Sequence, residues 1–147
     1  HENVGWGKIA IPEESLHTSS MWITFDAGAT KGLDREQIAM GLAGIGHLAR
    51  NLAPIYCLCD PGDVGADSQV RAPFTEQPTV YLYDMVPGGV GLAEKLFEVR
   101  NQLIDACLAL VKACTCENGC PGCVGPQVEP NSPARKAATL MLERLIA

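Results

Sequence analysis

The stretch that decides the fold is Cys114-Thr115-Cys116-Glu117-Asn118-Gly119-Cys120-Pro121-Gly122-Cys123. It holds four of the chain's seven cysteines within ten residues. Zinc binds four thiolates tetrahedrally, and the glycines and the proline of this stretch supply the turns that a loop needs to wrap one ion. Four protein ligands leave no position for a substrate water. We therefore expect one structural zinc ion bound by the four cysteines.

Other uses of these cysteines compete with zinc. Two disulfides would suit a secreted protein, but a C-x-C pair bridges with difficulty and seven cysteines leave one thiol unpaired. The same four thiolates could hold an iron–sulfur cluster. Cys120 and Cys123 alone, in the order C-P-G-C, could form a redox dithiol. The spacing favours zinc over these alternatives.

Length and charge limit the remaining possibilities. A chain of 147 residues can bury its own core, and we expect a single zinc-binding domain over residues 1–147. The net charge of −6 gives no general attraction to phosphate backbones or anionic lipid, so any contact with nucleic acid must be local. The cysteine content, with no apolar stretch of bilayer length and no export signal, predicts the reducing cytoplasm and no membrane partner. Because the chain begins at His1, we expect a piece of a longer polypeptide.

Strands are predicted at residues 4–11, 20–26, 54–60 and 79–84. The second has the period-two alternation of a strand with one buried face. The third is apolar on both faces, which predicts a central place in the sheet. Its Cys57 and Cys59 are then expected to be buried structural cysteines rather than a second thiol site. The polar residues 66–78 contain prolines and predict a loop or hairpin.

The first predicted helix begins with a capping box formed by Asp34 and Gln37 and runs for about five turns up to Pro54. Its interior contains Gly41, Gly44 and Gly46. Because glycine weakens a helix, these residues predict close packing against a neighbouring backbone. His47 lies off the apolar stripe and is expected to be hydrogen-bonded or partly exposed rather than a metal ligand.

Two more helices complete the predicted fold. A long amphipathic helix over residues 92–113 leads directly to Cys114, and a last helix follows the N-cap Ser132 and Pro133. The sequence therefore predicts an α+β fold. A small mixed or antiparallel sheet is packed by about three helices, with a four-cysteine zinc knuckle between the last two.

Carboxylates near the strand ends are further candidates. Asp60 and Asp63 lie in a turn, and we interpret them as a structural polar site rather than a metal site. Asp84 is a third member of this class and precedes the turn Met85-Val86-Pro87-Gly88-Gly89-Val90-Gly91. A glycine-rich turn before a helix can bind phosphate. Since the lysine and the glycine spacing of the known phosphate loops are absent, we interpret the turn as a packing feature.

Together these motifs resemble a known family. They are Tyr83-Asp84-x-x-Pro87-Gly88-Gly89-x-Gly91, a long helix, Cys114-x-Cys116-x3-Cys120-Pro121-x-Cys123 and a closing helix. Upstream, Thr18-x3-Trp22 and Cys59-Asp60-x2-Asp63-x-Gly65 follow the same family pattern. In this order, over nearly the whole chain, they are similar to the C-terminal zinc-binding domain of MrfA-type DEAD/DEAH-box DNA helicases.

The resemblance implies a zinc site made by Cys114, Cys116, Cys120 and Cys123, in a domain appended to two RecA-like motor lobes. Family members are 3′-to-5′ DNA translocases linked to repair of damaged or crosslinked DNA, and related domains occur in phage-defence proteins. The chain has no Walker A lysine motif and no D-E-x-[DH] box. ATP and Mg²⁺ would therefore bind only in the missing motor lobes, and we expect the chain alone not to be an enzyme.

The resemblance also implies partners. One partner is the pair of RecA-like lobes, in the same chain or in a partner chain. The other is DNA, which would be single-stranded and bound only by the whole protein. The domain would complete the path of this DNA and couple the two lobes. Candidate DNA or interdomain contacts are Trp22, Arg71, Pro87, Gly88, Gly89, Gly91, Lys95 and Arg100. Solvated charges and a core tryptophan are the simpler interpretation of these residues. The alternative functions are a protein-interaction module of a repair or phage-defence complex, or a C-P-G-C redox protein.

Overall fold

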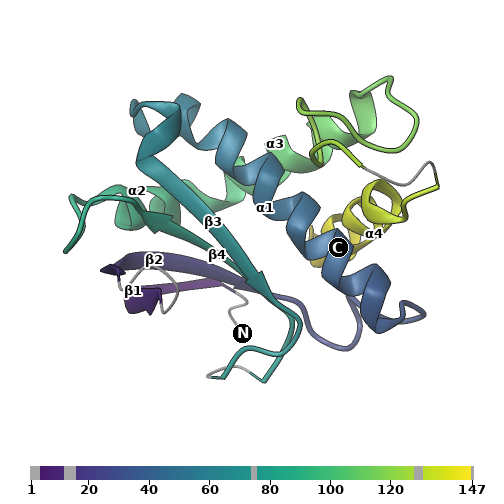
Figure 1. The fold of residues 1–147 in the computed structure, drawn as a ribbon, viewed down its shortest axis with the longest axis horizontal. Coiled ribbons are helices and arrows are strands. Elements are labelled where there is room, and N and C mark those ends of the chain that lie inside the picture. Colours follow the sequence, from purple (N-terminus) through teal and green to yellow (C-terminus); the bar gives the residue numbers. More distant parts are fainter. Residues whose placement is uncertain (1–3, 12–15, 74–75, 128–130, 147) are drawn as a thin grey trace.

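The structure is a computed structural model that describes residues 4–11, 16–73, 76–127 and 131–146 (Figure 1). Its strands are β1 (Val4–Ile11), β2 (Leu16–Thr24), β3 (Val64–Gln69) and β4 (Thr79–Asp84). They form one sheet in the order β1-β2-β4-β3, in which every neighbouring pair is antiparallel. The α+β fold class is confirmed, and the sheet is antiparallel rather than mixed.

The helices are α1 (Arg35–Cys57), the short 3₁₀ helix η1 (Pro61–Asp63), α2 (Leu92–Glu98), α3 (Arg100–Ala113) and α4 (Ala134–Ile146). α1 contacts β3 and β4, whereas α2 contacts β1, β2 and β4. α3 and α4 contact α1 and each other, and Figure 1 shows α1 between them and the sheet. No helix in the described part of the chain has the length and apolarity that a membrane crossing requires.

One face of the sheet forms the core. Met21 and Ile23 of β2 lie opposite Leu82 and Val80 of β4, and all four side chains are at most 2% exposed. They join one apolar cluster with buried residues of the helices, among them Leu42, Ile45, Leu48, Leu96 and Leu103. The predicted period-two alternation is confirmed, although β2 begins earlier than predicted and ends at Thr24.

The start of α1 is the predicted capping box. The Asp34 carboxylate accepts a hydrogen bond from the backbone N–H of Gln37 at 2.8 Å. The Gln37 side-chain oxygen accepts from the backbone N–H of Asp34 at 2.9 Å. Two N–H groups that the first turn leaves without helical partners are thereby satisfied, which determines where the helix begins.

Of the three α1 glycines, Gly41 and Gly44 pack closely as predicted, although mainly against side chains rather than against a backbone. A Cβ atom on Gly44 would lie 2.9 Å from the Cβ of Val124, in the segment after the cysteines. One on Gly41 would lie 3.0 Å from the Cβ of Ala137 in α4. The missing side chains let α1 approach α4 and the cysteine segment closely.

The strand predicted at residues 54–60 is wrong. α1 continues through Pro54 and ends at Cys57. Leu58 caps the helix in the left-handed conformation, with φ of 53°, and donates its N–H to the carbonyl of Pro54 at 3.1 Å. The Leu58 side chain is 94% exposed, so this segment does not lie in the centre of a sheet.

Tertiary packing explains why the helix crosses its proline. Buried Ala49 and Ala53 and partly buried Leu52, Tyr56 and Cys57 contribute to the core at helical spacing on both sides of that residue. This burial offsets the hydrogen bond that proline removes from a helix. As a consequence, Cys57 lies half-buried at the end of a helix and not within a central strand.

Two other boundaries differ from the prediction. β3 and β4 pair as a hairpin, which is one of the two options predicted for residues 66–78, and β3 covers the first part of that range. The β3 sequence V-G-A-D-S-Q has little strand propensity, so its pairing with β4 determines its conformation. The predicted long helix over residues 92–113 breaks at Val99 into α2 and α3, so the described part of the chain has four α-helices instead of about three.

We predict that Gly44→Val lowers the free energy of unfolding by about 1–3 kcal/mol, because the new side chain would overlap Val124. The matched control is Ala43→Val on the exposed neighbouring position of the same helix, where only the helix propensity of valine acts, at a cost of about 0.5 kcal/mol. Urea unfolding followed by circular dichroism measures both. Equal losses in the two variants would contradict the close packing.

Candidate metal centre

The four cysteines of the sequence motif follow directly from α3. Cys114 is the C-terminal cap of this helix. The carbonyl of Cys120 then accepts hydrogen bonds from the N–H groups of Cys123, at 3.0 Å, and Gly125, at 2.9 Å. Gly119 has φ of 154°, and a Cβ atom there would lie 2.7 Å from the carbonyl oxygen of Gly125. A glycine-dependent turn thus returns the last two cysteines to the first two.

The four sulfur atoms form a compact cage. All lie within 4.8 Å of one another. The Sγ–Sγ distances are 3.4 Å for Cys114 and Cys116, 3.5 Å for Cys114 and Cys120, 3.4 Å for Cys116 and Cys123, and 3.6 Å for Cys120 and Cys123. Four thiolates bound about 2.3 Å from a zinc ion would form a tetrahedron with edges of about 3.8 Å. The cage therefore fits one zinc ion, and all seven cysteines of the chain are free of disulfides.

Protonation in the cage is uneven. A hydrogen bond from the backbone N–H of Cys116 lowers the pKa of the Cys114 thiol to about 7. Loss of solvent raises the pKa of Cys116 to about 12, and the hydrogen bond with the Cys114 sulfur raises the pKa of Cys120. Thiolates this close repel one another, so the thiols cannot all ionise unless a cation lies among them. A divalent metal ion would replace the protons and take up all four sulfurs.

α1 holds the cysteine loop from one side. His47 Nε2 lies 2.9 Å from the carbonyl oxygen of Pro121, and the side-chain amide of Asn51 donates to the same oxygen at 3.0 Å. Gly125, with φ of 92°, lies against the imidazole of His47. A Cβ atom added to Gly125 would lie 3.4 Å from Nδ1 of His47. The prediction that His47 makes a hydrogen bond rather than binding metal agrees with this contact. Asn51 was not predicted, although the spacing of four residues places it on the same helix face as His47.

α4 holds the same loop from another side. The Nη2 atom of Arg135 donates to the carbonyl oxygens of Val111, at 3.0 Å, and Cys114, at 2.5 Å. Its Nη1 atom donates to the carbonyl of Cys116. No local pattern in the sequence indicates this residue, because its partners lie a full segment away in the chain. Side chains from α1 and α4 therefore hold the loop that carries the cage.

The family model of the MrfA Zn-binding domain matches residues 45–124, which include all four cysteines. The chain belongs to the MrfA Zn-binding domain family. The resemblance seen in the sequence is thereby confirmed, and a zinc-binding domain that contains a tetracysteine cage supports Zn²⁺ as its metal.

The relatives of this MrfA Zn-binding domain include helicases. The chain is 39% identical over 128 residues to the uncharacterized ATP-dependent helicase YprA of Bacillus subtilis, a match that covers 87% of the chain and 17% of YprA. A crystal structure of the DUF1998 helicase MrfA bound to DNA matches with a TM-score of 0.77 and 34% identity, covering 88% of the chain and 17% of MrfA. The chain is thus a zinc-binding domain of the MrfA and YprA helicase type and spans a small part of those proteins.

A third relative is much shorter. The uncharacterized protein MJ1572.1 of Methanocaldococcus jannaschii is 34% identical over 83 residues, and the match covers 54% of this chain and 74% of that protein. Most of that relative therefore corresponds to part of an MrfA Zn-binding domain.

Asp84 is fully buried at the end of β4. Its carboxylate accepts hydrogen bonds from the N–H groups of Val86 at 3.1 Å, Val90 at 2.5 Å and Leu92 at 3.4 Å. The hydroxyl of Thr18 donates to the backbone carbonyl of Asp84 at 2.7 Å. The start of α2, where a phosphate would bind, is thus occupied by the domain's own carboxylate. This geometry agrees with the interpretation of the glycine-rich turn as a packing feature.

Asp60 and Asp63 lie in the turn formed by η1. The carboxylate of Asp63 accepts from the N–H of Asp60 at 3.0 Å, and the N–H of Asp63 donates to the carbonyl of Asp60 at 3.0 Å. Within the described ranges, the four cysteines are the one group of three or more ligand-type side chains that converge. The Asp63 carboxylate therefore acts here on the backbone of the turn.

The candidate DNA contacts lie on separate elements. Arg71 is paired with Glu76 at 3.4 Å in the hairpin, Lys95 with Glu98 at 3.9 Å on α2, and the guanidinium of Arg100 lies 4.2 Å from the centre of the Phe97 ring. The ring of Trp22 lies on the sheet face opposite to the one that carries Met21 and Leu82. Its centre is 6.5 Å from the centre of the Tyr81 ring. Pro87, Gly88, Gly89 and Gly91 belong to the turn that Asp84 closes.

The cysteines outside the cage are poorly reactive. Burial raises the pKa of Cys57 to about 11 and that of Cys107 to about 12, and it also raises the pKa of Cys59. Because the protonated form of a thiol is a weak nucleophile, a raised pKa lowers the reactivity of each of these thiols. Cys57 and Cys59 are half-buried rather than buried as predicted, and within the described ranges neither joins a group of three or more ligand-type side chains.

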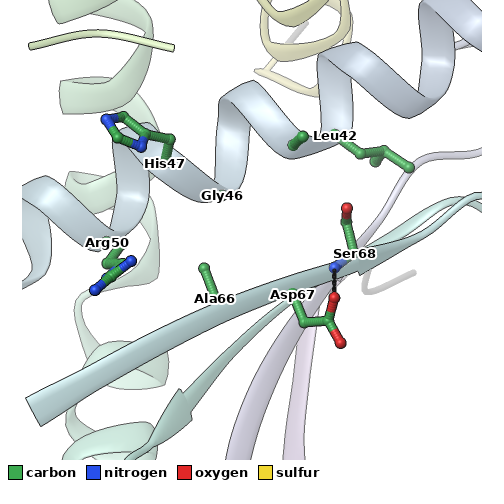
Figure 2. Close-up of a pocket in the computed structure, with 8 residues that line it drawn as sticks. Leu42, Gly46, His47, Arg50, Ala66, Asp67 and Ser68 are labelled. Carbon is green, nitrogen blue, oxygen red and sulfur yellow. Dashed lines mark hydrogen bonds between the residues drawn. The ribbon is translucent and has the colours of Figure 1, made fainter. Parts of the chain in front are cut away.

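A cavity of about 240 Å³ opens between α1 and β3 (Figure 2). Its lining residues are Leu42, Ala43, Gly46, His47, Arg50, Ala66, Asp67 and Ser68. Figure 2 shows Ala66 pointing toward α1, whereas Asp67 points away and accepts from the N–H of Ser68 at 2.8 Å. His47 thus has two roles, because it lines this cavity and also contacts the Pro121 carbonyl of the cysteine loop.

We predict that Asp84→Ala lowers the free energy of unfolding by at least about 2 kcal/mol, because three backbone N–H groups lose a charged acceptor. Asp67→Ala is the control, since its exposed carboxylate accepts from a single N–H and should cost less than about 1 kcal/mol. Denaturant unfolding measures both. A smaller loss at Asp84 than at Asp67 would contradict the assigned role.

Proposed function

We propose that Cys114, Cys116, Cys120 and Cys123 together hold one structural zinc ion, in an accessory domain of an ATP-dependent DNA helicase. The observation that carries this proposal is the closed four-sulfur cage between α3 and α4. A zinc ion with four protein ligands has no open position for water, so it would organise the fold and not catalyse. The isolated domain would therefore not be an enzyme. ATP and Mg²⁺ would bind to motor lobes of the same polypeptide or of a partner chain.

Within the helicase, we infer that the domain completes the path of the DNA and couples the movements of the RecA-like lobes. The structural similarity to MrfA bound to DNA supports this setting. The net charge of −6 argues against strong binding of DNA by the domain alone. DNA, in single-stranded form, would be contacted only in the context of the whole protein. We further infer a role in DNA repair and a reducing, cytoplasmic environment, in which thiolates stay available for zinc.

We predict that Cys120→Ser reduces the zinc content of the purified chain, because serine supplies no thiolate. Its melting temperature should fall by about 10 °C, the shift expected for a loss of about 3 kcal/mol in a domain of this size. Elemental analysis and thermal unfolding followed by circular dichroism measure the two effects. Cys57→Ser, which changes a half-buried cysteine outside the cage, should keep its zinc. Unchanged metal content and melting in Cys120→Ser would refute the site.

A second prediction concerns the native polypeptide that carries this domain. There, Cys120→Ser should retain most of the DNA-stimulated ATP hydrolysis and lose most of the DNA unwinding, because the motor lobes stay intact while their coupling to the DNA path fails. ATPase and strand-displacement assays on the same preparation separate the two activities. Equal loss of both would contradict a coupling role, and full unwinding would show that the domain is dispensable for it.

MJ1572.1 favours a second candidate function. A relative that consists mostly of the matched segment suggests a protein-interaction module that works without a motor in the same polypeptide. The native reading frame distinguishes the two functions, since only the helicase proposal requires Walker motifs in the same or a partner chain. A redox role for Cys120 and Cys123 would instead require these thiols to be metal-free and reactive, which thiol titration before and after chelation measures.

A further inference from the structure

We propose that Arg135 is a positioning residue of the zinc site, whose guanidinium holds the backbone of the first two cysteines so that their sulfurs remain in the cage. This inference rests on the proposed set of four cysteine ligands. It assigns to α4, which contributes no ligand, a direct influence on how tightly the metal is bound.

The geometry around Arg135 carries the proposal. Its Nε and Nη2 atoms donate to the Val111 carbonyl at 3.2 and 3.0 Å, in the last turn of α3, where carbonyls lack helical partners. Nη2 also donates to the Cys114 carbonyl at 2.5 Å, and Nη1 donates to the Cys116 carbonyl. Because the guanidinium is a rigid planar fork, it sets the relative positions of three carbonyls at once. Two of them belong to proposed ligands.

Charge favours the same role. Zinc with four thiolates carries a net charge of −2, and the C-terminus of α3 adds a partial negative charge beside it. The Nη1 atom of Arg135 lies 3.9 Å from the Cys116 sulfur, so the positive charge of the guanidinium offsets part of this negative charge. Lys112, also near the end of α3, is engaged with Glu143 at 3.2 Å. Arg135 thus supplies both hydrogen bonds and a counter-charge to the loop.

The packing of α4 delivers Arg135 to this place. The hydroxyl of Ser132 accepts a hydrogen bond from the N–H of Ala134 at 3.2 Å. This bond caps the start of α4, one residue before Arg135. Ala137 and Met141 pack against α1 at Gly41, where a Cβ atom would lie 3.0 Å from the first and 2.9 Å from the second. α4 is therefore fixed by contacts that do not involve the cysteines. Its arginine can hold the loop from a rigid support.

The same helix offers a matched control. Arg144 also donates from its guanidinium to two backbone carbonyls, those of Ala29 at 3.3 Å and Lys31 at 2.6 Å. These carbonyls precede α1 and lie far in sequence from the cysteine loop. Replacement of Arg144 removes a comparable clamp and tests whether any loss of α4 docking is enough to weaken the metal site.

The experiment measures the zinc dissociation constant of the full chain by competition with a colorimetric chelator. Arg135→Gln should raise this constant by about 10- to 100-fold, the usual effect of losing a partner that orients metal ligands. Arg135→Lys, which keeps the charge but not the planar fork, should give a smaller increase, and Arg144→Gln should give none. Cobalt substitution gives a second readout, because the absorption of tetrahedral Co²⁺–thiolate sites depends on ligand geometry. Arg135→Gln should alter that spectrum.

Two results would overturn the role of Arg135. One is a dissociation constant and cobalt spectrum in Arg135→Gln equal to those of the unchanged chain. The other is an equal weakening in Arg144→Gln, which would mean that general stability sets the affinity. If Arg135→Gln does not fold, Arg135→Lys decides the question by the same comparison. If the unchanged chain binds no zinc, or Cys120→Ser binds it equally well, the proposed ligand set itself fails, and the two failures are therefore distinguishable.

Discussion

Four thiol groups held within 4.8 Å of one another are the constraint on which the C-terminal half of this domain depends. The segment between α3 and α4 that the structure describes has no helix or strand of its own, so no backbone ladder holds it. Thiolates at this distance repel one another, and a zinc ion bound among them would neutralise part of their charge and form a bond with each sulfur. The position of the loop then follows from the ion and from the helices that grip its carbonyls.

α1 transmits this constraint to the rest of the fold. One of its faces packs on β3 and β4, and other faces meet α3 and α4. Gly41 and Gly44 let it approach α4 and the segment after the cysteines, while His47 and Asn51 hold the Pro121 carbonyl. α1 thus connects the proposed metal site with the other helices and with the sheet.

At the other side of the core, Asp84 organises the glycine-rich turn. Pieces of the family pattern that are far apart in the sequence meet there, because the Thr18 hydroxyl donates to the backbone carbonyl of Asp84. The carboxylate of Asp84 in turn caps the start of α2. The motif therefore describes a tertiary contact and not a binding loop. The Asp84 carboxylate accepts its hydrogen bonds from the domain's own backbone.

Local signals explain what the sequence could predict. Cysteine spacing, the Asp34 capping box and the alternation in β2 each depend on neighbours in the chain, and each led to the correct element. The crossing of Pro54 and the strand β3 depend on packing or pairing with distant segments, which no local pattern records. The same holds for the site. The cage was visible in the sequence, but Arg135 reaches it only because α4 docks on α1.

The measurement that tests this account most directly is X-ray absorption spectroscopy at the zinc edge, on the chain purified without added metal. A structural zinc centre predicts one zinc per chain with four sulfur neighbours at about 2.3 Å and no nitrogen or oxygen neighbour. A light-atom ligand in the first coordination sphere would mean an open site and a different role for the metal. Iron with sulfide, or a folded chain without metal, would contradict the structural zinc centre outright.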